Sequence, residues 1–91
     1  MKDKKLSETA EIQRKRLHFR SWHRGTRELD LIMGTFADWV LPELADAELD
    51  FYDQILTHSD PDLYNWITGV EAVPANYMNS VMARLLRHRV V

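Results

Sequence analysis

The apolar residues of this chain recur with the 3.6-residue period of an α-helix, and this periodicity constrains the fold more than any other feature of the sequence. The clearest case is the segment 27–41, where an i, i+3, i+4, i+7 stripe is made by Leu29, Ile32, Met33, Phe36 and Val40. No segment shows the period-two alternation of a half-buried β-strand. The sequence therefore predicts an all-α protein.

Five helices are expected, at about residues 11–23, 27–41, 47–57 and 61–68, and from residues 74–76 to about residue 87. Asp46 and Asp60 are suitable N-cap residues for the third and fourth of these helices, and Gly69 is suited to end the fourth. Gly34 is expected on the outer side of the second helix, where glycine costs about 1 kcal/mol relative to alanine. Because the connections are short, the helices are expected to pack as a small compact bundle.

The spacing of the aromatic residues predicts which of them face the core. Ile12, Phe19 and Trp22 recur at helical spacing in the first helix, which predicts that all three point inward. Trp39 and Tyr64 have two interpretations. They are either exposed anchors for a partner or, as is more common for such side chains, part of the core.

The length and composition fit a single domain. We interpret residues 1–10 as a flexible N-terminal segment and residues 11–91 as one helical-bundle domain. The lack of cysteine excludes a disulfide framework and a Cys-based metal site, and the short apolar runs exclude a membrane span. The N-terminus has no apolar core of a secretory signal, and acidic residues interrupt its basic stretch as they would not in a mitochondrial transit peptide. A cytoplasmic location is therefore expected.

The net charge of −2 hides a strong partition of charge along the chain. Residues 1–27 carry nine lysines and arginines against three acidic residues. Residues 28–74 carry eleven acidic residues and no lysine or arginine, and residues 75–91 carry three arginines. An asymmetry of this kind can steer a partner. The simpler interpretation, which we favour, is that the acidic helices are solvated and pair with the basic first helix.

No set of residues has the spacing of a metal, nucleophile or phosphate site. The histidines are not four residues apart on one helix and form no His-Glu-x-x-His pattern; they are His18, His23, His58 and His88. The serines lack the context of a nucleophile elbow, and the three glycines are too far apart for a phosphate-binding loop. We therefore predict no catalytic, metal-binding or cofactor-binding residue, and no independent enzyme.

The basic first helix supports an alternative class of function. Its arginines and lysine alternate with Phe19 and Trp22, as phosphate contacts and stacking aromatic residues do in nucleic-acid-binding proteins. The acidic remainder of the chain would repel phosphate, so nucleic acid is not the favoured partner. A nucleic-acid-binding or antitoxin-like regulatory module remains the alternative.

The expected junction of the first two helices carries the segment Arg24-Gly25-Thr26-Arg27-Glu28-Leu29-Asp30. Gly25 is free to take a positive φ and to let a foreign backbone approach. Glu28 lies in the first turn of the next helix, where the helix dipole favours an anion. The ordinary interpretation is a turn glycine beside an i, i+4 ion pair between Arg24 and Glu28. The functional interpretation is a docking site for another protein.

These residues resemble a known protein family. The resemblance rests on Arg24-Gly25-x-x-Glu28-x-Asp30, then Phe36, then, about thirty residues after the first pattern, Asp60-Pro61-Asp62-Leu63-Tyr64-Asn65-Trp66. This combination is similar to the succinate dehydrogenase assembly-factor family, whose members are flavinylation factors. The resemblance covers about four-fifths of the chain, and its strength lies in the joint occurrence of both segments in a cysteine-free helical chain of this size.

The resemblance implies a small helical protein that promotes covalent attachment of FAD to the flavoprotein subunit of succinate dehydrogenase, with the related fumarate reductase as a further bacterial client. It implies that Arg24, Gly25 and Glu28 contact the client near its flavin, flanked by Arg27 and Asp30. FAD is then the cofactor of the client and is not held stably by this chain. We expect a monomer, with a weak homodimer as the alternative.

The sequence departs from the family pattern at two positions. His23 stands where the family often has another arginine, and Ala45 stands where its third helix usually begins with serine or threonine. Neither position lies in the core motif. The role of Glu28 is open between a hydrogen bond to the client and the relay of a proton.

Overall fold

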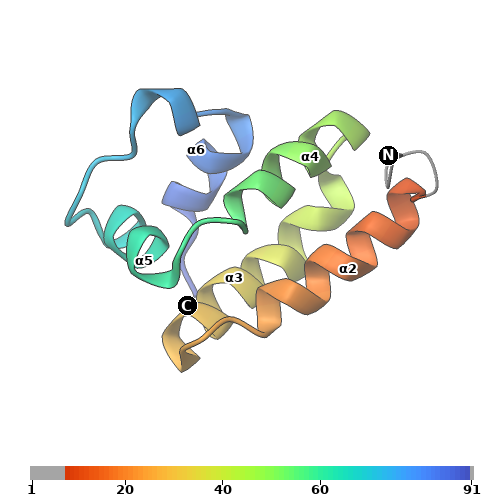
Figure 1. Ribbon diagram of the computed structural model, residues 1–91. Helices are drawn as coiled ribbons and strands as arrows, with labels where there is room; N and C mark the ends of the chain where they lie inside the picture. Colours follow the sequence, from red (N-terminus) through yellow and green to blue (C-terminus); the bar gives the residue numbers. More distant parts are fainter. Residues whose placement is uncertain (1–7, 91) are drawn as a thin grey trace.

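The computed structural model describes residues 8–90, which form five α-helices and two short 3-10 helices (Figure 1). Their order is α2 (Ala10–Trp22), α3 (Arg27–Val40), η1 (Leu41–Glu43), α4 (Asp46–Ile55), α5 (Asp60–Thr68), η2 (Ala75–Tyr77) and α6 (Ser80–Arg87). No strand occurs within residues 8–90, so the predicted all-α fold class is confirmed. None of the helices in this range is long and apolar enough to cross a membrane.

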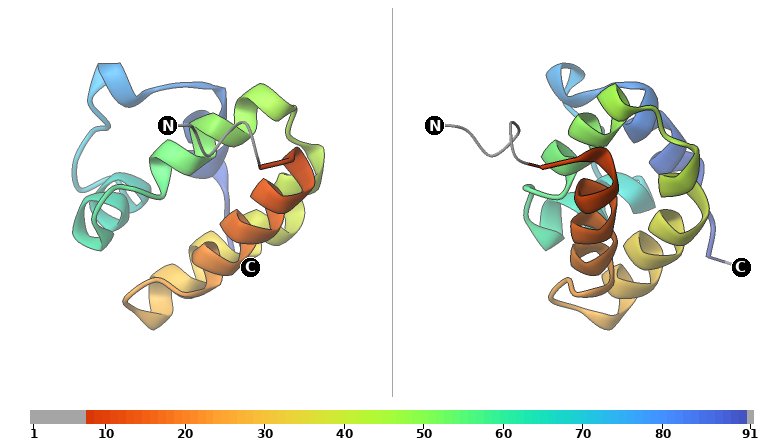
Figure 2. Two further views of the ribbon diagram at one scale, coloured as in Figure 1. Left: turned by 45° about the vertical axis from the view of Figure 1, so that its right-hand side comes forward. Right: turned by 90° about the vertical axis from the view of Figure 1, so that its right-hand side faces the viewer.

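The helices α2 and α3 form an antiparallel hairpin and lie side by side in every view (Figures 1 and 2). α4 packs against α2 and α6, and α5 contacts α6. The core lies between the hairpin and the other three helices. Each α-helix contributes at least one side chain with no exposed area, and these include Leu17, Met33, Phe36, Leu49, Tyr52, Leu63, Val81 and Leu85.

The inward face of α2 differs from the prediction. Ile12 is 52% exposed and Phe19 is 62% exposed, so neither belongs to the core. The fully buried residues of this helix are Leu17 and Ser21. Ser21 is tolerated there because its hydroxyl donates to the Leu17 carbonyl at 2.7 Å and lies 2.6 Å from the hydroxyl of the buried Tyr52. A satisfied serine thus occupies a core position that the apolar pattern assigned to other residues.

Gly34 is buried against α2, and the prediction that it lies on the outer side of its helix is wrong. A Cβ atom at this position would overlap the indole ring of Trp22. The missing side chain therefore lets the Trp22 ring pack directly onto the α3 backbone. Gly34 and Trp22 thus form a direct contact between the two helices of the hairpin.

The helix starts of α4 and α5 are each shifted by one residue from the expected caps. Asp46 and Asp60 are the first helical residues rather than the N-caps. Ser59 caps α5, and its hydroxyl accepts a backbone N–H of the first turn at 3.3 Å. At α4 the carboxylate of Glu48 accepts the backbone N–H of Ala45 at 2.9 Å. Glu48 thereby supplies half of a capping box where no serine or threonine stands.

The last helix begins later than expected. The predicted start at residues 74–76 falls on the 3-10 helix η2, and α6 starts at Ser80. Asn79 caps α6, because its side chain accepts the backbone N–H groups of Val81 and Met82 at 3.0 and 2.8 Å. Gly69 ends α5 with a φ of 84°, as predicted from the preference of glycine for the left-handed region.

The basic helix α2 pairs with acidic residues of α4, which confirms the favoured interpretation of the charge partition. Arg16 donates to the Asp53 carboxylate at 2.7 Å and to the Glu8 carboxylate at 2.7 Å. Burial alone would raise the pKa of Asp53, but the hydrogen bond and charge of Arg16 hold it below its usual value. Gln13 adds a hydrogen bond to the Asp50 carboxylate at 2.9 Å.

The N-terminal segment predicted to be flexible lies mostly outside the described residues. Within residues 8–10, Glu8 pairs with Arg16, the Thr9 hydroxyl accepts the N–H of Ile12 at 3.2 Å, and Ala10 begins α2. The prediction for residues 1–7 concerns a part of the chain that the structure does not describe.

Gly34→Ala is expected to destabilise the protein, although alanine normally stabilises a helix by about 1 kcal/mol relative to glycine. The new Cβ overlaps the Trp22 ring, so urea unfolding should show a loss of about 1–3 kcal/mol. In a Trp22→Ala background the space is free, and Gly34→Ala should then raise the free energy of unfolding. If Gly34→Ala stabilised the protein with Trp22 present, the packing of Trp22 on Gly34 would be contradicted.

His88 is expected to make stability fall as the pH is lowered. Its Nε2 lies 2.8 Å from the Thr35 hydroxyl, and its ring packs edge-on against Phe36. Burial, and then the charge of Arg89, lower the pKa of His88 below its ordinary value of 6.5. Because the unfolded chain binds this proton more tightly, the stability that neutral His88 contributes is complete above 6.5 and is lost as the pH falls through the folded pKa.

Urea unfolding at about pH 7.5 and about pH 5 measures this effect. The unaltered protein should lose more free energy of unfolding between the two conditions than His88→Gln, in which the side chain does not titrate. Equal losses in both proteins would show that His88 carries no part of the pH dependence.

Candidate functional site

The turn between α2 and α3 meets the N-terminus of α5, and we call this meeting point the corner. It consists of residues 24–30 together with Asp60, Pro61 and Tyr64. The Asp60 carboxylate joins the two parts: one oxygen accepts from Arg24 Nε at 3.0 Å and the other accepts the Gly25 N–H at 2.7 Å. The two sequence segments that carry the family resemblance are therefore in direct contact, although Gly25 and Asp60 are 35 residues apart.

Arg24 is the residue that holds the corner in place. Its side chain is only 10% exposed. Besides Asp60, its guanidinium donates to the Leu56 carbonyl and the His58 carbonyl, each at 2.8 Å. The forked geometry of arginine matches this set of acceptors, which a lysine would not satisfy. The expectation that Arg24 reaches out to a client differs from this arrangement, because its donors are engaged within the chain.

The conformation of Gly25 differs from the one expected. Its φ is not positive, and Gly69 alone has a positive φ within residues 8–90. A Cβ atom on Gly25 would instead lie 2.5 Å from the Asp60 carboxylate oxygen that accepts the Gly25 N–H. Glycine therefore allows the close approach of Asp60. Gly25 itself is exposed, so its backbone is accessible to another protein.

The remaining motif residues divide into one that braces the turn and two that face solvent. Asp30 accepts the backbone N–H of Arg24 at 2.6 Å and so closes the turn. Arg27 and Glu28 are exposed on the first turn of α3, which Thr26 caps by accepting a backbone N–H at 3.2 Å. The expected ion pair between Arg24 and Glu28 does not form, since Arg24 pairs with Asp60. Glu28 keeps its carboxylate at a helix N-terminus, where the dipole stabilises it.

Two hollows flank the contact between Asp60 and Gly25. The smaller has a volume of about 280 Å³ and is lined by Thr26, Glu28, Leu29, Asp60, Pro61 and Tyr64. The larger has a volume of about 410 Å³ and is lined by Phe19, Arg20, His23, Arg24, Gly25 and Asp60. The corner thus presents a polar rim around two shallow depressions. Surfaces of this shape suit side chains inserted by a protein partner.

Sequence reasoning missed the contact made by Asp60 and left the placement of Tyr64 open. Asp60 was interpreted as a helix cap, whereas its carboxylate fixes the turn that precedes α3. Tyr64 is exposed and lines the smaller hollow together with Glu28. Of its two interpretations, the surface position is therefore correct. Trp39, the other open case, is 75% exposed. The available signal was the joint occurrence of the segments 24–30 and 60–66.

Two of the three arginines of α2, Arg14 and Arg16, are engaged within the chain. Arg14 donates to the carbonyls of Leu41 and Leu44 at 3.2 and 2.7 Å, and Arg16 is held between Glu8 and Asp53. A nucleic-acid interface needs free cations that can replace the counterions of phosphates. The helix therefore lacks, at these positions, the row of free guanidiniums on which the nucleic-acid alternative depended.

Comparison with known proteins identifies the family. Residues 15–89 match the sequence model of a family described as "Flavinator of succinate dehydrogenase". The chain is 41% identical over 86 residues to "Succinate dehydrogenase assembly factor 2, mitochondrial" of Mycosarcoma maydis, a match that covers 93% of this chain and 36% of that protein. The proteins of the same name are 39% identical over 87 residues in Scheffersomyces stipitis and 36% identical over 84 residues in Dictyostelium discoideum.

The two latter matches cover 92% and 90% of this chain, and 58% and 59% of the respective relatives. The chain therefore spans between about one third and three fifths of the length of these three relatives. The family model matches residues 15–89, which make up most of this chain. The predicted family is therefore confirmed: the chain belongs to the family of succinate dehydrogenase flavinators.

Proposed function

We propose that this chain is an assembly factor that promotes covalent attachment of FAD to the flavoprotein subunit of succinate dehydrogenase, and that it docks through the corner. One observation carries the proposal: Gly25 and Glu28 are both exposed at the corner, beside a turn that hydrogen bonds between Arg24, Gly25 and Asp60 hold in place. Membership of the flavinator family and the assembly-factor names of the relatives support it.

The proposal divides the motif into two groups of residues. Arg24, Asp30 and Asp60 position the turn from within the fold. Gly25 and Glu28 contact the client, with Arg27 beside them. A site whose supporting residues are fixed in advance loses little conformational entropy on binding. The internal contacts of Arg24 thus contribute to docking indirectly, by holding its neighbours in place.

The chemistry proposed for this chain is assistance to a reaction in its client. The client would supply both the bound FAD and the residue to which the FAD becomes attached. An accessory protein raises the rate of such a step by holding the client's domains so that the reacting atoms stay in attack geometry. Glu28 either hydrogen-bonds a client group near the flavin or accepts a proton there. The chain itself is proposed to hold no FAD and to act as a non-catalytic factor.

The scope of the proposal includes partners and location. The related fumarate reductase flavoprotein is a second proposed client, and the free chain is proposed to be a monomer. The relatives described above are named as mitochondrial proteins. For this chain we propose the cytoplasm, to be checked by cell fractionation with an antibody against the native protein.

Glu28→Ala is expected to fold normally and to reduce covalent flavin on the client. Glu28 is exposed, so circular dichroism and urea unfolding should match the unaltered protein within about 0.5 kcal/mol. The measurement is in-gel flavin fluorescence of the flavoprotein subunit after coexpression. Glu71→Ala, which alters another exposed carboxylate that lines neither hollow of the corner, is the matched control and should leave flavin attachment unchanged. Full flavin attachment with folded Glu28→Ala would reject the site.

Glu28→Gln separates the two roles proposed for this residue. Glutamine keeps hydrogen-bonding capacity but accepts no proton. Near-normal flavin fluorescence with Glu28→Gln would assign a hydrogen-bonding role, and a loss equal to that of Glu28→Ala would assign the role to the carboxylate charge or its basicity. Gly25→Arg is a less informative variant, because any Cβ at this position also disturbs Asp60.

The two arginines of the motif are expected to behave differently. Arg24→Ala removes a nearly buried guanidinium and leaves one oxygen of the Asp60 carboxylate and two carbonyls without the donors that Arg24 supplies, so the free energy of unfolding should fall by about 2–4 kcal/mol. Arg27→Ala changes an exposed side chain, so its free energy of unfolding should stay within about 0.5 kcal/mol of that of the unaltered protein. This variant should nevertheless lower flavin attachment to the client. Equal stability of both variants would refute the positioning role of Arg24.

A further inference from the structure

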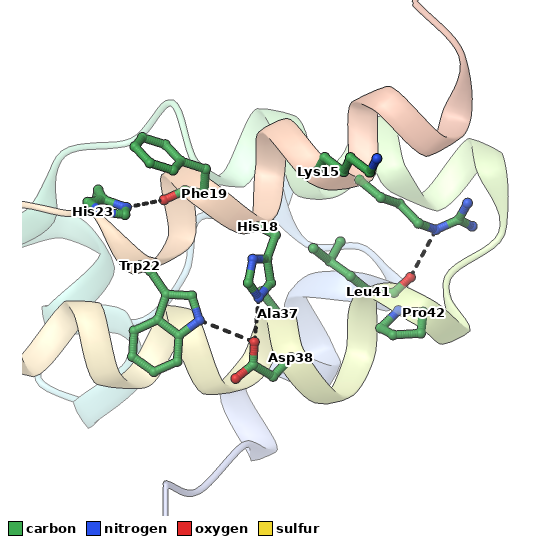
Figure 3. Close-up of a pocket in the computed structure, with 10 residues that line it drawn as sticks. Lys15, His18, Phe19, Trp22, His23, Ala37, Asp38, Leu41 and Pro42 are labelled. Atoms are coloured by element: carbon green, nitrogen blue, oxygen red, sulfur yellow. Dashed lines mark hydrogen bonds and ion pairs between the residues drawn. The ribbon is translucent and has the colours of Figure 1, made fainter.

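A groove of about 850 Å³ runs between α2 and α3, and the docking site proposed above does not use it (Figure 3). Its apolar lining consists of Phe19 and Trp22 from α2 with Ala37, Leu41 and Pro42 from α3 and the turn that follows. Phe19 is 62% exposed, although burial of a phenylalanine side chain away from water is favourable. The groove is therefore an apolar depression that the chain leaves open.

The aromatic side chains of the groove are held in place by contacts within the chain. The Phe19 ring stacks on His23 with ring centroids 3.9 Å apart, and His23 Nδ1 lies 2.7 Å from the Phe19 carbonyl oxygen. Trp22 Nε1 donates to the Asp38 carboxylate at 3.2 Å, and His18 Nε2 bonds the same oxygen (Figure 3). A partner that binds here meets side chains that are already ordered, which lowers the entropic cost of association.

The groove continues into the corner. Phe19 and His23 line the groove, and both also line the larger hollow beside Arg24, Gly25 and Asp60. These two residues are thus the shared wall between the groove and the docking motif. A protein whose backbone contacts Gly25 comes within reach of Phe19 without a change in the fold.

The size of a stable interface favours the same protein as the occupant of both sites. Stable complexes bury about 800 Å² and roughly 20–30 residues on each partner. The exposed corner offers only a few side chains, chiefly Arg27, Glu28 and Tyr64, beside the backbone of Gly25. A client that binds here must therefore also cover an adjoining face. The groove adjoins the corner directly and offers the apolar area that drives association.

We propose that an apolar segment of the client flavoprotein subunit lies in the groove between α2 and α3, with an aromatic or branched side chain against Phe19. This inference rests on the proposed function and extends the proposed contact surface from the corner along the groove between α2 and α3. Phe19 acts as the anchor of the second contact, and Gly25 and Glu28 act at the first.

The test measures the affinity of the purified flavoprotein subunit for three forms of this chain by isothermal titration calorimetry. Phe19→Ala removes the proposed anchor from an exposed site. Phe51→Ala is the matched control, because Phe51 is also exposed but lies on α4 and lines neither the groove nor the corner. The dissociation constant should rise about tenfold or more for Phe19→Ala and change less than about twofold for Phe51→Ala. Circular dichroism should show that both variants keep the helical fold.

A photo-crosslinking amino acid placed at position 19 or at position 51 identifies the occupant. Irradiation should join position 19 to the flavoprotein subunit and should leave position 51 unjoined. Normal affinity of Phe19→Ala would overturn the groove proposal alone, as would a crosslink from position 19 to a second copy of this chain. No binding of the subunit by the unaltered chain would overturn the proposed function and the groove proposal together.

Discussion

The contact between the Asp60 carboxylate and the Arg24–Gly25 pair is the interaction on which the site depends. It joins the turn after α2 to the first residue of α5, and the same guanidinium reaches the carbonyls that follow α4. The carboxylate is stabilised from both sides, by the arginine and by the N-terminus of its own helix. A nearly buried guanidinium is favourable only when its donors find acceptors, so these partners form a unit that tolerates little change.

Periodicity predicted the number of helices and most of their limits, because each helix presents a continuous apolar stripe or a clear end signal. It failed for the inward face of α2. There the buried residue Ser21 is polar, and the apolar residue Phe19 is exposed. The apolar residues at helical spacing in α2 are therefore not the residues that face the core. Gly34 was misplaced for a related reason, since a glycine contributes nothing to an apolar pattern and the ring that packs on it, Trp22, comes from another helix.

The position of the corner was predictable from the sequence, but the contacts among its residues were not. The motif pointed to the junction of α2 and α3, and the structure places Gly25 and Glu28 there on the surface. The internal engagement of Arg24 was not predictable, because its partner Asp60 is 36 residues away and the arrangement depends on how α5 packs. The same tertiary contact explains the glycine, whose Cβ would strike Asp60. Sequence patterns report local geometry, whereas these roles follow from contacts between distant segments.

The pairing of α2 with α4 has a consequence for how this protein meets others. Arg14 and Arg16 face acceptors in their own chain, and the whole sequence carries a net charge of only −2. Such a molecule projects a weak long-range field, so its encounters should proceed at the rate of uncharged surfaces, about 10⁵–10⁶ M⁻¹s⁻¹, with little dependence on ionic strength. Selectivity between right and wrong partners then resides in the lifetime of the complex after contact.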